Sequence, residues 1–300
     1  MKRILPFLLI LCLLPIASLA DGGIVAPFAE NTPERQIASA IADRLALPCV
    51  FAEQADGAGA ANRMLSDPSL ILCDTQSSLS ASLQGYTDAD LRTAMLPLCQ
   101  AARCPLYLVM DKDAAASLGI ADAASFLSYI QENEYELLLA RHISADAIDR
   151  AATLLSNELP LMADYFLPEE VLSALHSGDV QAAIVDGARL IEAADDRLLL
   201  LCALGDQRAK AYPDLPCAAE LDIPICQDIF LGLYMQKDGD QALIEKTQAL
   251  LSAADLEDTL LPLGYSFSPL DQQAFEQLVR DTFADYKRYM TAEGLFFYEE

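Results

Sequence analysis

The stretch GIVAPFAENTPERQIASAIADRL at residues 23–45 joins a short apolar strand to an amphipathic helix. Residues 23–28 predict the strand, and apolar side chains recur at helical spacing within residues 33–45. Thr32 is a residue type that caps helices, and Pro33 suits the first helical position. The stretch therefore predicts a strand–loop–helix unit whose loop covers residues 27–32.

The same alternation continues along the chain. Strands alternating with helices favour βαβ units and parallel sheets, so we expect an α/β protein with mixed, mostly parallel sheets. Apolar runs predict further strands at 49–52, 70–73, 106–110, 135–140, 181–186, 197–203 and 229–235. Helical patterns cover 60–65, 88–95, 121–131, 145–156, 169–175, 240–253 and 269–288.

The length of 300 residues suggests two domains of roughly 150 residues each. No Gly/Ser-rich or Pro-rich linker separates the halves, so we expect the chain to cross between two lobes more than once, at strands 106–110 and 229–235. Lobe 1 would then hold residues 21–108 and 232–300, and lobe 2 residues 109–231. Such crossings form the floor of a ligand cleft that can close by a hinge.

The N-terminus has the pattern of a secretory signal. Lys2 and Arg3 precede an apolar stretch at 4–16, and small residues follow before Asp21. We expect residues 1–20 to be a signal peptide, with an uncleaved anchor as the alternative. The predicted location is the periplasm or the outer cell surface.

The net charge of −26, from 45 acidic and 19 basic residues, bears on the partners. Nucleic-acid binding requires clustered Lys and Arg, so we expect no nucleic-acid partner. The same charge opposes adsorption to anionic lipids.

Seven cysteines follow the predicted signal, and export favours disulfides. Two close pairs, Cys99–Cys104 and Cys217–Cys226, could each bridge locally, and an odd count leaves at least one thiol free or paired between chains. The remaining cysteines sit in apolar runs and are expected to be small buried hydrophobic residues: Cys49, Cys73 and Cys202.

Motifs for catalysis, metals and cofactors are missing from the sequence. There is no G-x-S-x-G, H-E-x-x-H or Walker loop. No C-x2-C pair occurs, and His142 and His176 are the only histidines, so we expect no metal or cofactor. A Cys–His pair of Cys73 and His142 keeps a secreted hydrolase as a disfavoured alternative. We therefore expect no enzyme.

Four short motifs carry a resemblance: VAPFA at 25–29, GAG at 57–59, YPDLPCAAE at 212–220 and FLGLY at 230–234. Their order and spacing over residues 23–288 resemble the substrate-binding receptors of tripartite tricarboxylate transporters, the Bug or TctC family. YPDLPCAAE is the most specific of them, because family members carry a similar lPDVPTvaE segment.

The resemblance implies a type II periplasmic-binding-protein fold that holds a small carboxylate or amino acid between its lobes. It also implies a membrane permease of the tripartite tricarboxylate type as a partner, and we expect a monomer. Family members grip the ligand with loops that correspond to 27–32 and 57–62, where glycines permit positive φ and close backbone approach. The nominated ligand-binding residues are Phe28, Ala29, Glu30, Asn31, Thr32, Gly57, Ala58, Gly59, Asn62, Asp74, Thr75, Gln76, Arg141, His142, Ser144, Tyr165 and Asp186.

Acidic residues stand at several of the nominated positions, and this departs from the family pattern. Glu30 stands where relatives are Gly-rich, and it would repel an anion if it faced the cleft; a ligand with an ammonium group would then fit better. Asp74 and Asp186 follow strands and either bind ligand or cap the next helix. Arg141 either forms a fork with a ligand carboxylate or is a surface residue. A binding-protein scaffold that contacts a sensor or partner is the alternative function.

Overall fold

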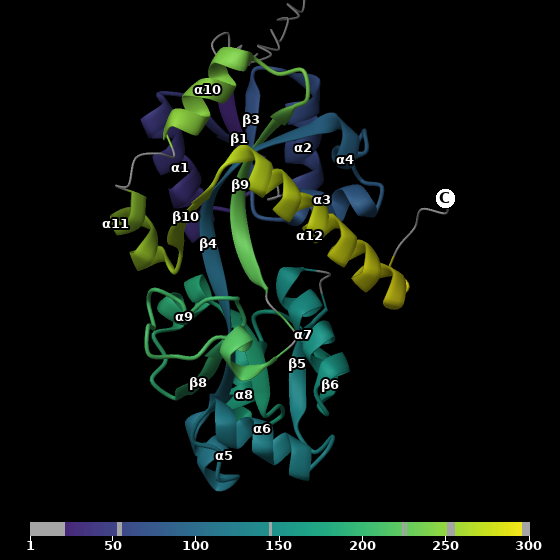
Figure 1. Cartoon of the computed structure of the whole chain (residues 1–300), viewed down its shortest axis with the longest axis vertical. Coiled ribbons are helices and arrows are strands. Elements are labelled where there is room, and N and C mark those ends of the chain that lie inside the picture. The colour runs from purple at the N-terminus through teal and green to yellow at the C-terminus, as the bar shows by residue number, and fades with distance from the viewer. Residues whose placement is uncertain are drawn as a thin grey trace, which may run out of the picture.

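The computed structural model describes residues 22–52, 56–143, 146–223, 225, 227–250 and 256–295. The predicted signal peptide lies outside these residues. Among the described helices, none combines the length and apolar composition that crossing a bilayer requires. Figure 1 shows two lobes stacked along the long axis and joined by two long strands.

The first lobe is built on a sheet with the strand order β2-β1-β3-β9-β4, with β10 pairing to β4. β1 is parallel to β2 and β3, whereas β9 is antiparallel to both β3 and β4. The strands are β1 (Gly23–Ala26), β2 (Cys49–Phe51), β3 (Leu70–Asp74), β4 (Met95–Asp111), β9 (Asp228–Gln236) and β10 (Ser266–Leu270).

The second lobe continues the same sheet in the order β4-β7-β5-β6, with β8 also pairing to β4. β5 is parallel to β6 and β7, and β4 is antiparallel to β7 and β8. Its strands are β5 (Leu138–His142), β6 (Met162–Phe166), β7 (Ala182–Asp186) and β8 (Leu198–Ala203). The expected two-lobed α/β fold with mixed sheets is confirmed; the residue boundaries of the lobes stay a prediction.

The strand β4 is shared by both lobes. Residues 95–105 pair with β9, and residues 106–111 pair with β7 and β8. The sequence predicted only 106–110, because Pro97 and Pro105 are typical strand breakers. Register shifts between Pro97 and Cys99 and between Gln100 and Ala102 accommodate this segment as bulges within the longer strand.

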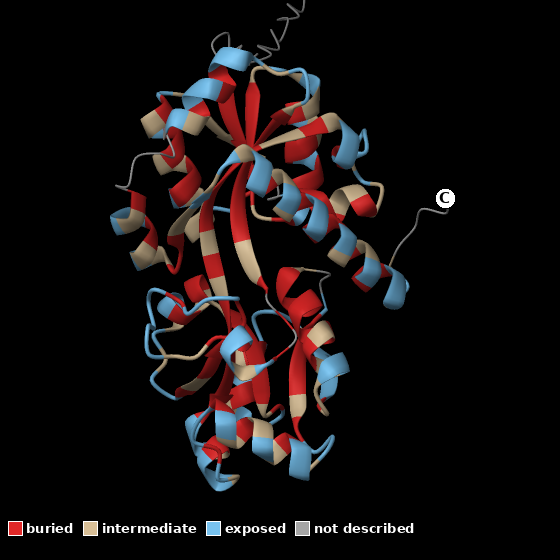
Figure 2. Ribbon diagram, viewed as in Figure 1, coloured by how far each residue is buried: buried red, intermediate tan, exposed pale blue. Residues whose placement is uncertain are grey.

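Helices cover both faces of each sheet, and Figure 2 shows the buried strands between helices with exposed outer faces. On α1 (Pro33–Leu45), Ile37 and Ile41 pack in the core cluster that contains Ile24 of β1. The other helices are α2 (Gly57–Ser66), α3 (Ser77–Leu83), α4 (Leu91–Ala94), α5 (Lys112–Ser117), α6 (Ala123–Glu132), α7 (Ala147–Glu158), α8 (Val171–Ser177), α9 (Gly187–Ala193), α10 (Gln241–Leu250), α11 (Glu257–Leu260) and α12 (Gln272–Ala292), with 3-10 turns at Ala218–Leu221 and Leu261–Leu263.

Several elements were not predicted from the sequence. β6 is an exposed edge strand without a buried face, and β10 contains Pro269, so neither has the usual strand pattern. The short helices α3, α5, α9 and α11 have no long apolar stripe; Asp111 caps α5 and Asp186 caps α9, whereas the N-cap residues of α3 and α11 make no side-chain cap. The last helix begins at Gln272 rather than at 269, because Asp271 caps it.

The predicted local bridge between Cys99 and Cys104 is wrong. Both are buried thiols, and five residues along an extended strand span about 16 Å, too far for a disulfide. Cys217 also carries a free thiol, and Cys226 lies outside the described residues. Cys73 and Cys202 are buried as expected, and Cys49 is partly buried.

Two glycines with left-handed backbone provide a matched test of packing. A Cβ at Gly264, where φ is 81°, would lie 2.3 Å from the backbone of Gly187 and Ala188, whereas a Cβ at Gly178, where φ is 82°, would meet nothing within 4 Å. We expect Gly178→Ala to lower the free energy of unfolding by about 1–2 kcal/mol through backbone strain. Gly264→Ala should lower it by about 3 kcal/mol or more. Urea unfolding measures both, and equal losses would contradict the packing argument.

Candidate functional site

A cavity of about 470 Å³ lies between the two lobes. It is found where β3 and β7 end and the next helices begin, which is where open α/β sheets bind ligands. From the first lobe it is lined by Thr75, Gln76, Ser77, Ser80, Gln84 and Tyr286. From the second lobe and the start of β9 it is lined by Asp146, Ala147, Ile148, Asp186 and Ile229.

A second cavity of about 380 Å³ adjoins the first within the second lobe. Asp146, Ile148 and Asp186 line both cavities, so the two are neighbouring parts of one cleft. His142 lines the second cavity, and its Nδ1 lies 3.0 Å from Oδ2 of Asp146.

Aspartates cap the helices that begin at this cleft. Asp186 accepts a hydrogen bond from the amide of Arg189 at 2.7 Å, and Asp146 accepts one from the amide of Asp149 at 2.7 Å. Asp74 is fully buried and accepts from the Ser78 amide at 2.8 Å. The sequence left a capping role open for Asp74 and Asp186, and both cap. Their carboxylates therefore occupy some of the helix amides that a ligand anion could otherwise use.

Asp186 has an unfavourable electrostatic position. Burial raises the pKa of its carboxyl above the ordinary value of 3.8, and the charge of Glu34 on α1 raises it further. Hydrogen bonds from the amides of Arg189 and Ala188 oppose this shift without cancelling it. The positive charge of Arg189 also opposes the shift, but no ion pair to Asp186 occurs among the described residues.

Gln76 connects the cleft to the crossing strand and to α12. Its side chain is buried, its Nε2 donates to the carbonyl of Asp228 at 3.3 Å, and its Oε1 accepts from the Tyr286 hydroxyl at 3.4 Å. These contacts fix the side of the cleft formed by the first lobe.

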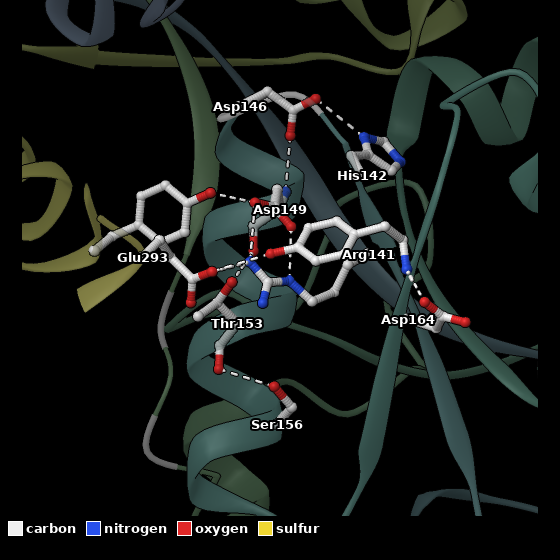
Figure 3. A network of polar contacts seen from close by, with 10 residues as sticks. Arg141, His142, Asp146, Asp149, Thr153, Ser156, Asp164 and Glu293 are labelled. Carbon is white, nitrogen blue, oxygen red and sulfur yellow. Dashed lines mark hydrogen bonds and ion pairs between the residues drawn. The ribbon is translucent and has the colours of Figure 1, made fainter. Parts of the chain in front are cut away.

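A polar network ties α12 to the second lobe, as Figure 3 shows around Arg141. Arg141 donates to Oδ1 of Asp149 at 2.9 Å and to Oε2 of Glu293, just after α12, at 3.1 Å. The hydroxyls of Tyr165 and Tyr289 donate to Glu293 and Asp149 respectively. Burial raises the pKa of Asp149 even though Arg141 and Tyr289 donate to it.

Arg141 is only 8% exposed, so the surface alternative is wrong. Its guanidinium is held by two carboxylates and lies 4.5 Å from the centre of the Tyr165 ring. Tyr165 itself is 49% exposed. In this arrangement Arg141 links the lobes, and its predicted fork with a ligand carboxylate remains untested.

The predicted loop at 27–32 lies outside the residues that line the two cavities. Phe28 is buried, whereas Ala29, Glu30 and Asn31 are exposed, so Glu30 points to solvent. Thr32 caps α1 as predicted, accepting from the Arg35 amide at 3.3 Å. The ligand-binding role of this loop stays a prediction.

The predicted loop at 57–62 is the first part of α2. Gly57, Ala58 and Gly59 form its first turn with helical backbone, so the expected positive φ at the glycines is wrong. A Cβ at Gly57 would lie 2.4 Å from Oγ of Ser77, so this glycine allows α2 to pack closely against α3. Asn62 accepts from the Asp88 amide at 2.7 Å.

Of the nominated residues, Thr75, Gln76, His142 and Asp186 line the cleft, and Ser144 lies outside the described residues. Sequence reasoning missed Asp146 and Tyr286. Asp146 fell inside the helix predicted at 145–156, although Asp is a capping residue type and the structure makes it the cap of α7. Tyr286 had no signal in the sequence, since it belongs to the apolar stripe of a long helix.

Asp186→Asn should raise the melting temperature of the unliganded protein at pH 7, because Asn also caps helices and carries no charge to desolvate. The carboxyl of Asp186 has a higher pKa in the folded protein than in the unfolded chain. Burying its charge therefore lowers the free energy of unfolding fully at pH values above the folded-state pKa, and not at all at pH values below the unfolded-state pKa. The gain should therefore shrink as the pH falls towards 3.8. Scanning calorimetry from pH 4 to 7 measures it. The exposed cap Asp271→Asn is the control, and no gain at pH 7 would contradict the expectation.

Tyr289→Phe removes the hydroxyl that donates to the buried Asp149. We expect a loss of about 1–3 kcal/mol in the free energy of unfolding, because a buried carboxylate loses a partner. Tyr129→Phe is the control, since the Tyr129 hydroxyl has no hydrogen bond among the described residues. Equal denaturation curves for the two variants would show that this contact contributes nothing.

No protein-family model and no curated protein sequence matches this chain. A TctC solute-binding protein from Polaromonas superposes with a TM-score of 0.75 at 15% identity, covering 90% of this chain and 98% of that one. MatC from Rhodopseudomonas palustris with bound malate gives 0.62 at 18%, covering 89% and 97%. An adipate-bound protein from R. palustris gives 0.66 at 18%, covering 91% and 97%. The chain thus has the fold of TctC-type solute-binding proteins, as the sequence resemblance implied.

Proposed function

We propose that this chain is a divergent, exported solute-binding protein that captures a small carboxylate-bearing metabolite or amino acid between its lobes without catalysis. The observation that carries the proposal is the cavity of about 470 Å³ at the strand ends, lined by polar groups from both lobes. Its size lies in the range of small-molecule sites. Malate and adipate are bound in two proteins of the same fold.

The connections between the lobes support capture by closure. β4 and β9 carry the chain from one lobe to the other beside the cavity, and shared strands of this kind can act as a hinge. The similarity in fold to a TctC solute-binding protein supports delivery to a membrane permease of the tripartite tricarboxylate type as part of the proposal. The signal pattern at residues 1–20 supports export.

The chemistry of the described residues gives little support to a hydrolase. The Cys73 thiol is buried, and burial raises its pKa well above the ordinary value of 9.0, so it is not a ready nucleophile. His142 lies on the second lobe, away from Cys73 on the first, and contacts Asp146 of its own lobe.

Native mass spectrometry of freshly purified protein tests the proposal, because a closed cleft can retain its ligand. Thermal shift against malate, adipate and the common amino acids gives a second measurement, since binding to the native state raises the melting temperature. Absence of any small molecule in both experiments would favour the partner-binding alternative, and turnover of a probe would favour an enzyme.

Gln84→Trp should weaken binding of the best probe at least tenfold, because the larger ring narrows a cavity that Gln84 lines at the end of α3. Gln131→Trp on the exposed face of α6 is the matched control. Isothermal titration calorimetry compares the two variants. Unchanged affinity in Gln84→Trp would place the ligand elsewhere.

A further inference from the structure

Among the described residues, the charged side chains that line the interlobe cavity are both acidic. They are Asp146 and Asp186, and none of the described Lys or Arg residues lines this cavity. The adjoining cavity adds Glu169, His142 and Arg189, and the guanidinium of Arg189 pairs with Glu192 at 3.1 Å. The negative charge of these carboxylates would therefore repel a dicarboxylate ligand.

Two arginines near the cleft interact with other protein groups. Arg141 is paired with Asp149 and Glu293, so its guanidinium presents no open fork to a ligand carboxylate. Arg150 donates through Nε to Gln227 at 2.9 Å and stacks 4.2 Å from the centre of the Tyr286 ring. Its buried Nη1 has no hydrogen-bond partner among the described residues, but Arg150 is not among the residues that line the interlobe cavity.

An aspartate already accepts from one amide at the start of each helix around the cleft. The Ser78 amide of α3, the Asp149 amide of α7 and the Arg189 amide of α9 donate to Asp74, Asp146 and Asp186 respectively. These internal carboxylates take part of the hydrogen bonding and helix-dipole stabilisation that an anionic ligand would need. They also add negative charge beside the position such a ligand would occupy.

Asp186 has fewer interaction partners than the other two aspartates. Asp74 accepts from Ser77 and Ser78, and Asp146 accepts from the Asp149 amide and contacts His142. Asp186 is partly buried, lines both cavities, and has only the first-turn amides of α9 as partners among the described residues. The Arg189 charge offsets only part of the burial penalty, and a desolvated carboxylate without an ion-pair partner gains from a cation that contacts it directly.

The walls of the cavity suit the remainder of such a ligand. Ile148 and Ile229 offer apolar surface, and the ring of Tyr286 can contact methylene groups or a cation. Gln76, Thr75 and Ser77 provide neutral hydrogen-bonding groups on the opposite lobe. Because these groups are neutral, they can hydrogen-bond a carboxylate or an amide on the ligand, but the ligand does not need to carry either one.

We infer that the ligand carries a protonated amine, which forms an ion pair with Asp186 across the cavity, so that the protein prefers amines and amino acids to dicarboxylates. This inference rests on the proposed function, since it names the ligand class of the same cleft. It also assigns Asp186 as the residue that determines specificity.

Matched probe pairs test the inference on the unmodified protein. Aspartate and succinate differ by one amine, as do glutamate and glutarate, and putrescine carries amines without a carboxylate. Calorimetric titration should give at least one amine-bearing probe a Kd ten or more times lower than that of its partner without the amine. For putrescine the comparison is with succinate. Similar or tighter binding of succinate or glutarate would overturn the inference while leaving the proposed capture of a small molecule intact.

The variant Asp186→Asn tests the assigned residue, because Asn keeps a capping oxygen for α9 and removes the charge. It should weaken the binding amine at least tenfold, whereas Asp271→Asn, an exposed cap at the far end of α12, should leave the affinity unchanged. Melting curves of both variants establish that they are folded. Unchanged amine affinity in folded Asp186→Asn would overturn the assignment. If none of the five probes binds and native mass spectrometry detects no retained small molecule, the proposed function and the inference both fail.

Discussion

The continuity of β4 is the constraint on which the arrangement of this molecule depends. One strand of 17 residues contributes hydrogen bonds to β9 and β10 in one lobe and to β7 and β8 in the other. The lobes can therefore change their relative angle only by bending or twisting shared strands, not by swinging on a loop. This fixes the strand ends of the two lobes opposite each other and creates the cavity between them.

A second constraint is electrostatic. The chain carries a formal charge of −26, and much of the acid near the cleft serves the backbone as helix caps. Capping stabilises each local structure, but it places carboxylates at the one surface where the two lobes meet. The ion pairs of Arg141 with Asp149 and Glu293 offset part of this repulsion and hold α12 against the second lobe. The cleft remains acidic because no described base forms an ion pair with Asp186, and the Arg189 charge offsets the burial of this carboxylate only in part.

Much of the fold could be predicted from interactions between residues close together in the sequence. Thr32 and Pro33 mark the start of α1 correctly, because capping depends on a few neighbouring residues. The first half of β4 was not readable, since its prolines suit a strand only where bulges and partner strands accommodate them. The cleft was partly readable, because Asp186 and Gln76 follow strands, whereas Tyr286 reaches it from a helix more than 200 residues away from Gln76. Gly57 was predicted to lie in a loop. Its actual role, to let α2 pack closely against Ser77, depends on a contact with a later helix that the local sequence does not reveal.

The first lobe is assembled from both ends of the chain, and this affects the order of folding. Its sheet needs β9 and β10, and its core also uses Phe275 and Phe283 of α12. The second lobe is built from one continuous middle segment, apart from its contacts with β4 and α12. The middle segment can therefore begin to collapse early, whereas the first lobe cannot complete its sheet and core until β9, β10 and α12 are available. Folding of the first lobe thus depends on contacts between segments far apart in the sequence, and that makes it the slower of the two lobes to form.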